Sequence, residues 1–291
     1  MKTSPRFFPI RFLLIVAAAA FFLSLSARAQ EALAGSPRKL PAVFLVGDST
    51  VKNSTRGLQG WGTPIASWFD QTKIKVENRA LGGRSSRSYI REELWDKVVA
   101  DLQPGDFVLI QFGHNDGGPL DEGRARASLK GDGEETKDVV IKETGVAETV
   151  RTYGAYLRRY VADTKAKGAT PIVCSLVPRN IWADGRVVRA SDSYGKWAEA
   201  VAKAKGVFFL DLNEIIARKY EAVGPEKVLA EYFTAADHTH TTPAGAAFNA
   251  ACVAEGIRAL PKCPLSAFVL REPTRLPATV PDAALTRPGP K

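Results

Sequence analysis

The sequence predicts a three-layer α/β/α protein in which a central parallel sheet of five strands lies between two layers of helices. Along residues 41–260, short apolar runs alternate with longer segments in which apolar residues recur every three or four positions. Continuous apolar runs are typical of strands buried on both faces, and the helices between them make neighbouring strands parallel. This alternation favours a flavodoxin-like sheet with strand order 2-1-3-4-5.

The first half of the chain supplies three strands and a helix. The first expected strand, 43–46, is an apolar run that ends at Gly47, and a shorter strand follows at 74–78. A spacing of four residues between apolar positions predicts a helix over 89–102. A Pro-Gly pair then ends this helix before the third strand, 107–110.

The second half repeats the alternation. The spacing of its apolar residues predicts a long amphipathic helix over 146–161, before a fourth strand at 172–177. The later elements are a helix over 192–205, a strand over 207–210, a helix over 212–220 and an Ala-rich helix that begins at Thr242-Pro243. Proline is favoured at the first position of a helix, which supports the last of these boundaries.

Two segments fall outside this pattern. Residues 117–145 are rich in glycine and charge and are too long for an ordinary connection. Loops of that length are often functional, so we expect this one to wall one side of a cleft. Residues 263–291 are Pro-rich with little periodicity and are expected to form a tail that is disordered or lies on the surface. The globular domain is therefore placed at 41–262.

The first 29 residues have the three parts of a signal peptide. Basic residues precede the apolar run 12–23, and an Ala-x-Ala site ends at Ala29. The run is shorter than the roughly 20 residues that a membrane-spanning helix needs. We expect cleavage after residue 29, a short polar leader over 30–40 and no stable membrane span afterwards. The mature protein is thus expected in the periplasm or outside the cell.

Charge and cysteine content add further limits. Residues 1–29 hold four basic residues and no acidic one, so their removal lowers the formal net charge from +9 to +5. The mature chain has no block of Lys and Arg that would indicate nucleic-acid binding. A mild basic excess is compatible with an acidic substrate. Cys174 is expected to be buried in a strand. For Cys252 and Cys263 two alternatives stay open, a disulfide between them or two free thiols.

Polar residues and glycines follow each of the first three expected strands. Ser49, in the sequence Gly-Asp-Ser-Thr, follows the first strand. A glycine pair, Gly82 and Gly83, comes after the second strand, and Asn115 comes after the third. In a flavodoxin-like sheet the first strand lies between the second and third. The three loops therefore meet at one point beside the topological switch point.

This meeting point has what acyl transfer requires. A serine oxygen attacks a carbonyl carbon, and fixed N–H groups stabilise the oxyanion that develops, each by about 2.7–4 kcal/mol. We expect Ser49 to be the nucleophile. Its backbone N–H, that of Gly83 and the Asn115 side-chain amide are expected to form the oxyanion hole. Taken singly, each has a simpler interpretation: Asp48 or Ser49 caps a turn, the glycines form a turn, and Asn115 is a loop residue.

A histidine near the end of the domain is the expected general base. Of the three histidines in the chain, His240 follows Asp237 by three residues. That spacing lets the carboxylate orient the imidazole, which can then accept the serine proton. His238 is adjacent to Asp237, points elsewhere and is expected to line a sugar-binding cleft. The alternative is a solvated polar turn that caps the last helix.

The blocks around these residues resemble a known family. Val51 occupies the position of the second glycine in the Gly-x-Ser-x-Gly elbow of the α/β-hydrolases, which counts against that fold. In order, the chain instead holds Gly47-Asp48-Ser49, Gly83, Gly113-His114-Asn115-Asp116 and Asp237-x-x-His240. This ordered set, over about 41–260, resembles the SGNH or GDSL-type hydrolases. The resemblance implies the SGNH fold and the roles given above to Ser49, Gly83, Asn115, Asp237 and His240, with no metal or cofactor.

The residues around these blocks resemble a smaller group within that family. Residues 83–89, 112–118 and 237–241 are similar to the rhamnogalacturonan acetylesterases. That similarity implies a serine carbohydrate esterase that removes acetyl groups from pectic polysaccharide, which is acetylated and acidic. Arg84 and Arg87 are expected to pair with uronate carboxylates, because guanidinium matches carboxylate geometry. Structural ion pairs are the alternative for both arginines.

Three other functions stay open at this point. The same chemistry would serve another ester, such as acetyl-xylan or a lipid. A metal-dependent phosphoesterase is suggested by a superficial likeness of residues 113–116 to a Gly-Asn-His-Asp motif, with Asp48, His238 and His240 as further ligands. The residue order in that motif is wrong, however, and no Asp-x-His follows the first strand. The third possibility is a sugar-binding protein without turnover.

Overall fold

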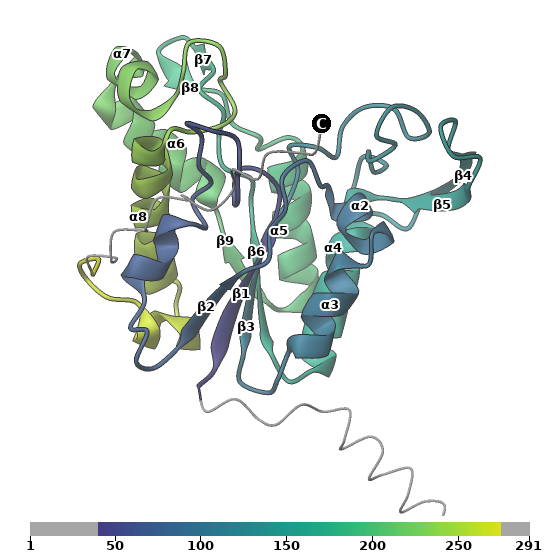
Figure 1. Cartoon of the computed structure of the whole chain (residues 1–291), viewed down its shortest axis with the longest axis horizontal. Coiled ribbons are helices and arrows are strands. Elements are labelled where there is room, and N and C mark those ends of the chain that lie inside the picture. The colour runs from purple at the N-terminus through teal and green to yellow at the C-terminus, as the bar shows by residue number, and fades with distance from the viewer. Residues whose placement is uncertain (1–39, 275–291) are drawn as a thin grey trace, which may run out of the picture. The chain divides into compact units, whose positions relative to one another are not determined.

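The computed structural model describes residues 40–274, which form a five-stranded parallel sheet flanked by helices (Figure 1). The strand order is β2-β1-β3-β6-β9. These strands are β1 Ala42–Gly47, β2 Lys75–Asn78, β3 Phe107–Gln111, β6 Thr170–Cys174 and β9 Phe208–Leu210. Every pairing in this sheet is parallel. The expected order, 2-1-3-4-5, is therefore confirmed.

Helices cover both faces of the sheet (Figure 1). One layer holds α2 Ser86–Arg91, α3 Leu94–Asp101, α4 Tyr153–Ala166 and α5 Tyr194–Lys205. The other holds η1 Pro64–Trp68, α6 Leu212–Val223 and α8 Pro243–Ala259. Three short elements complete this set: α7 Pro225–Lys227, the π-helical turn η2 Val228–Tyr232 and η3 Pro264–Phe268.

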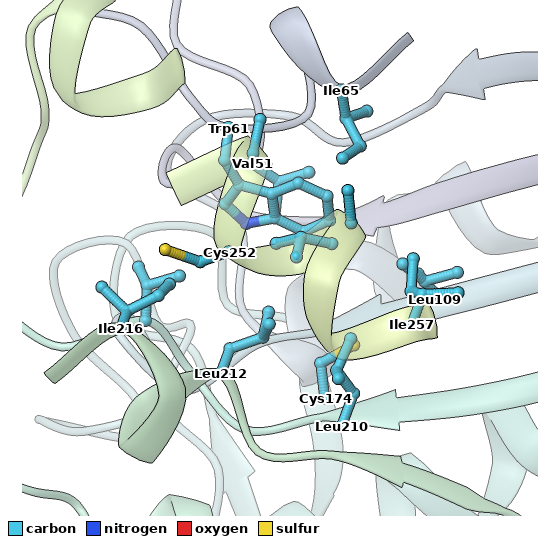
Figure 2. Packing of buried hydrophobic residues seen from close by; sticks show 14 of the residues in the cluster. Val51, Trp61, Ile65, Leu109, Cys174, Leu210, Leu212, Ile216, Cys252 and Ile257 are labelled. Carbon is cyan, nitrogen blue, oxygen red and sulfur yellow. The ribbon is translucent and has the colours of Figure 1, made fainter. Parts of the chain in front are cut away.

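Two hydrophobic cores fill the spaces between these layers. Alternate residues of β1 point to opposite faces: Val43 and Leu45 pack on the side of α6 and α8, and Phe44 and Val46 pack on the other side. This two-residue period is the geometry of an extended strand. Figure 2 shows side chains of the first core, among them Trp61, which is almost fully buried. The continuous apolar runs in the sequence arise because both faces are covered.

Two expected helices differ from the structure. The segment 89–102 is divided into α2 and α3, because Glu93 between them adopts a left-handed conformation with φ of 56°. The segment 146–161 is wrong in its first part: Ala147–Arg151 is strand β5, and α4 begins only at Tyr153. Residues spaced by four satisfied the helical pattern, but Thr152 caps α4 by accepting a hydrogen bond from the Ala155 N–H.

The long segment 117–145 contains structure of its own. Strand β4, Thr136–Val140, pairs with β5 in an antiparallel hairpin that projects from the sheet's helical layer (Figure 1). A second short hairpin joins β7 Trp182–Ala183 to β8 Arg186–Val187. The segment 117–145 is thus an ordered insertion between β3 and α4.

The C-terminal segment is packed over the part that the structure describes. Residues 263–274 had been expected to begin a surface or disordered tail, yet Leu265 is fully buried. Leu270 donates its N–H to the carbonyl oxygen of Trp68, and Val269 pairs with Phe69. The domain thus extends past the expected boundary at 262. The expected signal peptide, most of the leader and residues 275–291 lie outside the described residues.

All three cysteines are free thiols in buried positions. The possible disulfide between Cys252 and Cys263 is therefore not formed. Burial raises the pKa of the Cys252 thiol to about 12 and raises that of Cys263 as well. Within residues 40–274, no helix is both long enough and apolar enough to cross a membrane.

Candidate active site

The serine, histidine and aspartate expected from the sequence form a hydrogen-bonded triad. Ser49 Oγ lies 2.8 Å from His240 Nε2, and His240 Nδ1 lies 2.7 Å from Asp237 Oδ2. Ser49 sits on the turn after β1, where the N–H groups of Val51 and Lys52 both donate to the Asp48 carbonyl. The sheet edge and the turn before α8 thus bring together residues 191 positions apart.

Backbone hydrogen bonds fix the orienting carboxylate. Asp237 Oδ1 accepts the N–H groups of Thr239, at 2.8 Å, and His240, at 3.0 Å. Partial burial works to raise the pKa of Asp237, but the hydrogen bonds from His240 and Thr239 outweigh it and hold the pKa below its ordinary value. Asp237 therefore remains ionised, and it orients His240 so that Nε2 faces the serine.

The residues expected to form the oxyanion hole are connected to the loop that lies against Ser49. Gly82 lies against the serine, since a Cβ at Gly82 would stand 3.5 Å from Ser49 Cβ. Gly83 has φ of +80°, a conformation that favours glycine. Asn115 Nδ2 donates to the Arg84 carbonyl oxygen at 2.8 Å, which leaves its second hydrogen for a ligand. Among residues 40–274, the N–H groups of Ser49 and Gly83 donate to no protein acceptor.

A buried pair beneath the nucleophile was missed in the sequence. Asp48 Oδ2 lies 3.3 Å from His114 Nδ1, and both side chains are almost fully buried. His114 Nε2 donates to the Val177 carbonyl oxygen, 3.0 Å away. Burial works to raise the pKa of Asp48, but His114 and the hydrogen bonds from Thr50 hold it below its ordinary value. The pair ties the nucleophile turn to the loop that carries Asn115.

Asp116 anchors the end of the loop that carries Gly83 through its hydrogen bonds with Ser86. Its Oδ1 accepts hydrogen bonds from the N–H of Ser86, at 3.2 Å, and from the Ser86 hydroxyl, at 2.5 Å. Complete burial raises the pKa of Asp116 to about 6, although the Ser86 hydrogen bonds oppose this. Asp116 therefore joins the loop after β3 to the start of α2. A Gly-x-Asn-Asp block was the available signal for this role.

The triad is partly open to solvent, and two pockets are lined by residues of the loops around it. The Asp237 and His240 side chains are each 28% exposed. A pocket of about 310 Å³ is lined by His114, Leu176 and Arg179, among others. A second pocket is lined by the segment from Glu122 to Ala127, and Gly117 lines both. A partly exposed triad suits a substrate that extends beyond its ester group.

The expected substrate-binding arginines are engaged in structural contacts. Arg87 is fully buried and forms an ion pair with Glu148 at 2.6 Å, so its expected pairing with a uronate is wrong. The Arg84 guanidinium contacts Glu92 at 2.8 Å and donates to the Gly82 carbonyl oxygen. For both residues the structural alternative holds. His238 is exposed, and its carbonyl oxygen accepts the Asn180 N–H. Its contact with sugar stays a prediction.

The residues of the phosphoesterase alternative do not gather into a metal site. Over residues 40–274, no group of three or more His, Cys, Asp or Glu side chains has an arrangement that could hold a metal ion. His114 faces Asp48 and Val177, while His240 faces Ser49 and Asp237. His114 and His240 thus make separate sets of contacts and do not converge on a common point.

Comparison with known families agrees with this geometry. The sequence profile of the GDSL-like Lipase/Acylhydrolase family matches residues 45–248, a span that includes the whole triad. The chain belongs to this family. This GDSL-family protein is therefore a carboxylic ester hydrolase.

Two named relatives are similar over most of the chain. The rhamnogalacturonan acetylesterase of Emericella nidulans is 39% identical, and the match covers 74% of this chain and 86% of the relative. A probable rhamnogalacturonan acetylesterase of Bacillus subtilis is 30% identical, over 79% of this chain and 98% of the relative. Membership of the family thus rests on both the profile and these sequences.

Solved structures share the fold. A Bacillus subtilis protein, YxiM, superposes with a TM-score of 0.62 at 23% identity, over 77% of this chain and 57% of that chain. An acetyl-xylooligosaccharide esterase from Geobacillus superposes with a TM-score of 0.50 at 18% identity, over 74% of this chain and 93% of that chain. At these identities the likeness concerns the fold alone.

Proposed function

We propose that this GDSL-family hydrolase is a serine carbohydrate esterase that removes acetyl groups from pectic polysaccharide. The observation that carries the proposal is the triad geometry, in which Ser49, His240 and Asp237 are already within hydrogen-bond distance of one another. The substrate class is supported by two relatives named as rhamnogalacturonan acetylesterases, which match this chain over most of its length. The exposed triad suits a polymer that lies across the surface.

The chemistry proceeds in two steps. His240 Nε2 accepts the Ser49 proton as Oγ attacks the acetyl carbonyl carbon, and the oxyanion is stabilised by the N–H groups of Ser49 and Gly83 and the Asn115 amide. His240 then protonates the departing sugar oxygen. Water, deprotonated by His240, attacks the acyl-enzyme, and acetate leaves as Ser49 recovers its proton. Asp237 stabilises the imidazolium that forms in each step.

The site of action belongs to the same proposal. Polymeric pectin is encountered outside the cytoplasm, and residues 1–29 have the composition of a signal peptide. We therefore place the mature enzyme in the periplasm or outside the cell. Fractionation of the expressing cells, with N-terminal sequencing of the mature enzyme, tests this placement. Recovery of enzyme that retains residues 1–29 in the cytoplasm would contradict it.

The deciding experiment combines one mutation with a panel of substrates. Acetate release is measured for the wild type and Ser49→Ala on an aryl acetate, acetylated rhamnogalacturonan and acetyl-xylan. We expect Ser49→Ala to lose about 10⁴-fold or more in kcat on every substrate, since it removes the nucleophile. Ser54→Ala, which alters an exposed serine of the same loop, is the matched control.

The outcomes separate the mechanism from the substrate. Undiminished acetate release by Ser49→Ala would overturn the serine mechanism. A wild type that prefers acetyl-xylan, or acts only on aryl or lipid esters, would leave the mechanism in place and overturn the pectic assignment. Loss of wild-type activity in a chelator would favour the phosphoesterase alternative.

A further inference from the structure

Two arginines of the ordered insertion lie beside the oxyanion glycine. A Cβ built at Gly83 would stand 2.7 Å from Arg124 Nη1 and 3.6 Å from Arg126 Nη1. The neighbouring Gly82 lies against Ser49. Of these two adjacent residues, one therefore lies against the nucleophile and the other against two guanidinium groups. From the sequence, residues 117–145 were expected only to wall one side of a cleft, and neither arginine was assigned a role.

Neither guanidinium group has a carboxylate partner among the described residues. Arg126 Nη1 donates to the Gly83 carbonyl oxygen at 2.8 Å, and the Arg124 side chain makes no ion pair or hydrogen bond within residues 40–274. Asp48 and Asp116 attract Arg126 from a distance without contact. Partial burial and the nearby charge of Arg124 lower the pKa of Arg126, which is the mark of a cation that lacks a close counter-ion.

The acidic residues of the same pocket are engaged elsewhere. Glu122 forms an ion pair with Lys142 at 2.6 Å, and Glu143 accepts the N–H of Gly123. Both glutamates line the pocket with Arg124 and Arg126 but neutralise neither. The two guanidinium groups thus face an open pocket next to the reaction centre.

The backbone that presents the two arginines is held in a costly conformation. Ala125, between them, has φ of 43°, where a non-glycine residue loses about 1–2 kcal/mol. Buried contacts maintain it: Arg91 donates to the Ala125 carbonyl oxygen at 2.7 Å, and Arg87 donates to that of Ala127 at 2.8 Å. Strain that is held by surrounding structure is commonly found at ligand-binding sites. Arg87, expected to bind substrate, instead supports the loop that carries these cations.

We propose that Arg124 and Arg126 bind a uronate carboxylate of the substrate, close to the sugar whose acetyl group is attacked. This inference rests on the proposed function and assigns the acidic recognition to the insertion after β3. A planar guanidinium forms paired hydrogen bonds with a carboxylate, and two of them select an acidic sugar over a neutral one. Their position beside Gly83 sets the distance between the recognised carboxylate and the ester.

Arg179 is the competing location for this recognition. It is exposed in the loop after β6, lines the pocket of about 310 Å³ and makes no ion pair within the described residues. It lies beside Pro178 and Ile181, and no second arginine or lysine without an ion pair lines that pocket among the described residues. Arg189, in the same pocket, is paired with Glu214 and Glu221. Of these two pockets, therefore, the one lined by Arg124 and Arg126 holds two arginines without an ion pair among the described residues.

The test compares two forms of one substrate. Acetylated rhamnogalacturonan oligosaccharides are prepared with free carboxylates and with the same carboxylates methyl-esterified, and acetate release gives kcat/KM for each. The measured quantity is the ratio of the two values, so a loss of folded enzyme cancels. The variants are Arg124→Gln, Arg126→Gln, Arg124→Lys and Arg179→Gln, with Arg151→Gln as a control for an exposed arginine on the β4–β5 hairpin.

We expect the wild type and Arg151→Gln to favour the free carboxylates about tenfold, the difference that one charge-assisted contact supplies. Arg124→Gln and Arg126→Gln should bring the ratio close to one, and Arg124→Lys should retain part of it. High salt should lower the wild-type ratio, because the contact is solvent-accessible.

Other outcomes would overturn the inference and leave the proposed function intact. A wild type that releases acetate from both forms at equal kcat/KM recognises no carboxylate. A ratio lost in Arg179→Gln and retained in Arg124→Gln and Arg126→Gln would place the recognition in the other pocket. By contrast, failure of the wild type to deacetylate either form would contradict the proposed function itself.

Discussion

Two hydrogen bonds determine which nitrogen of His240 carries its proton. Asp237 Oδ2 faces Nδ1 at 2.7 Å and Ser49 Oγ faces Nε2 at 2.8 Å. A carboxylate accepts but does not donate, so Nδ1 carries the hydrogen and Nε2 is free to act as the base. The three side chains form one unit in which the orientation of the histidine depends on the aspartate.

Replacing the aspartate tests this dependence. In Asp237→Asn the amide can donate to Nδ1, which favours the tautomer with hydrogen on Nε2 and removes the base. We expect kcat on an aryl acetate to fall by about 10⁴-fold, with little change in KM. Asp184→Asn, an exposed carboxylate in the β7–β8 turn, is the control. An Asp237→Asn variant within tenfold of the wild type would contradict the assigned role.

The loop between β2 and α2 is the element that shapes the oxyanion hole. Its capping box, in which the Ser85 hydroxyl accepts the Ser88 N–H and the Ser88 hydroxyl accepts that of Ser85, fixes the start of α2. Asp116 accepts a hydrogen bond from the Ser86 N–H at the start of the same helix. The donor at Gly83 is thus set by a rigid helix start and by contacts with the insertion.

A methyl group at Gly83 should disturb this element. Gly83→Ala adds a Cβ at a φ of +80°, which strains the backbone that presents the N–H, and the Cβ would stand 2.7 Å from Arg124 Nη1, so the Arg124 side chain must also move. We expect kcat to fall by about 10²–10³-fold, the effect of losing one oxyanion donor. Gly57→Ala is a matched control, since Gly57 has φ of +83° and nothing within 4 Å of its Cβ position. Equal kcat values for the two variants would remove Gly83 from the oxyanion hole.

At this scale, local patterns predicted some elements and misassigned others. Strands β1, β3 and β6 were predicted from apolar runs that are buried on both faces, whereas the edge strands β2 and β9 are shorter and only partly buried. The residues of β5 were predicted as helix, because Val146 just before it, Val150 within it and Tyr153 after it fit a helical spacing of three and four residues. This stretch is a strand because it pairs with β4, the preceding strand of the same hairpin. The spacing of apolar residues within one segment does not reveal such a partner.

The stability of the whole domain includes the C-terminal segment. Leu265 is fully buried, and Phe268 packs edge-on against Phe107 with ring centroids 5.9 Å apart. We expect Leu265→Ala to lower the free energy of unfolding by about 2–5 kcal/mol, because it leaves a cavity. Leu229→Ala, at a side chain that is 42% exposed, should change it by less than about 0.5 kcal/mol. Urea denaturation measures both, and equal effects would show that residues 263–274 do not belong to the core.

Buried Asp116 links the stability of the whole molecule to pH. Its pKa of about 6 in the folded protein lies above the ordinary value of 3.8. The folded state therefore binds more protons in this window, and the free energy of unfolding falls as pH rises from about 4 to 6, by at most about 3 kcal/mol from this group. Asp116→Asn should show a weaker fall over that range.

Denaturation at pH 4, 5, 6 and 7 measures the difference between wild type and variant. Asp192→Asn, which changes an exposed carboxylate, should follow the wild-type curve. A parallel curve for Asp116→Asn would mean that Asp116 titrates near its ordinary pKa in the folded protein.

The sequence by itself determined the order of the sheet, the family and the identity of Ser49, Gly83, Asn115, Asp237 and His240. These follow from patterns within short segments: strand ends, a glycine turn and an aspartate three residues before a histidine. Only the tertiary structure decided the roles of Arg84, Arg87 and the insertion. Whether an arginine faces a substrate or a glutamate depends on residues distant in the chain, such as Glu148 for Arg87. Those contacts exist only once the chain has folded, and they leave Arg124 and Arg126 unneutralised beside the site.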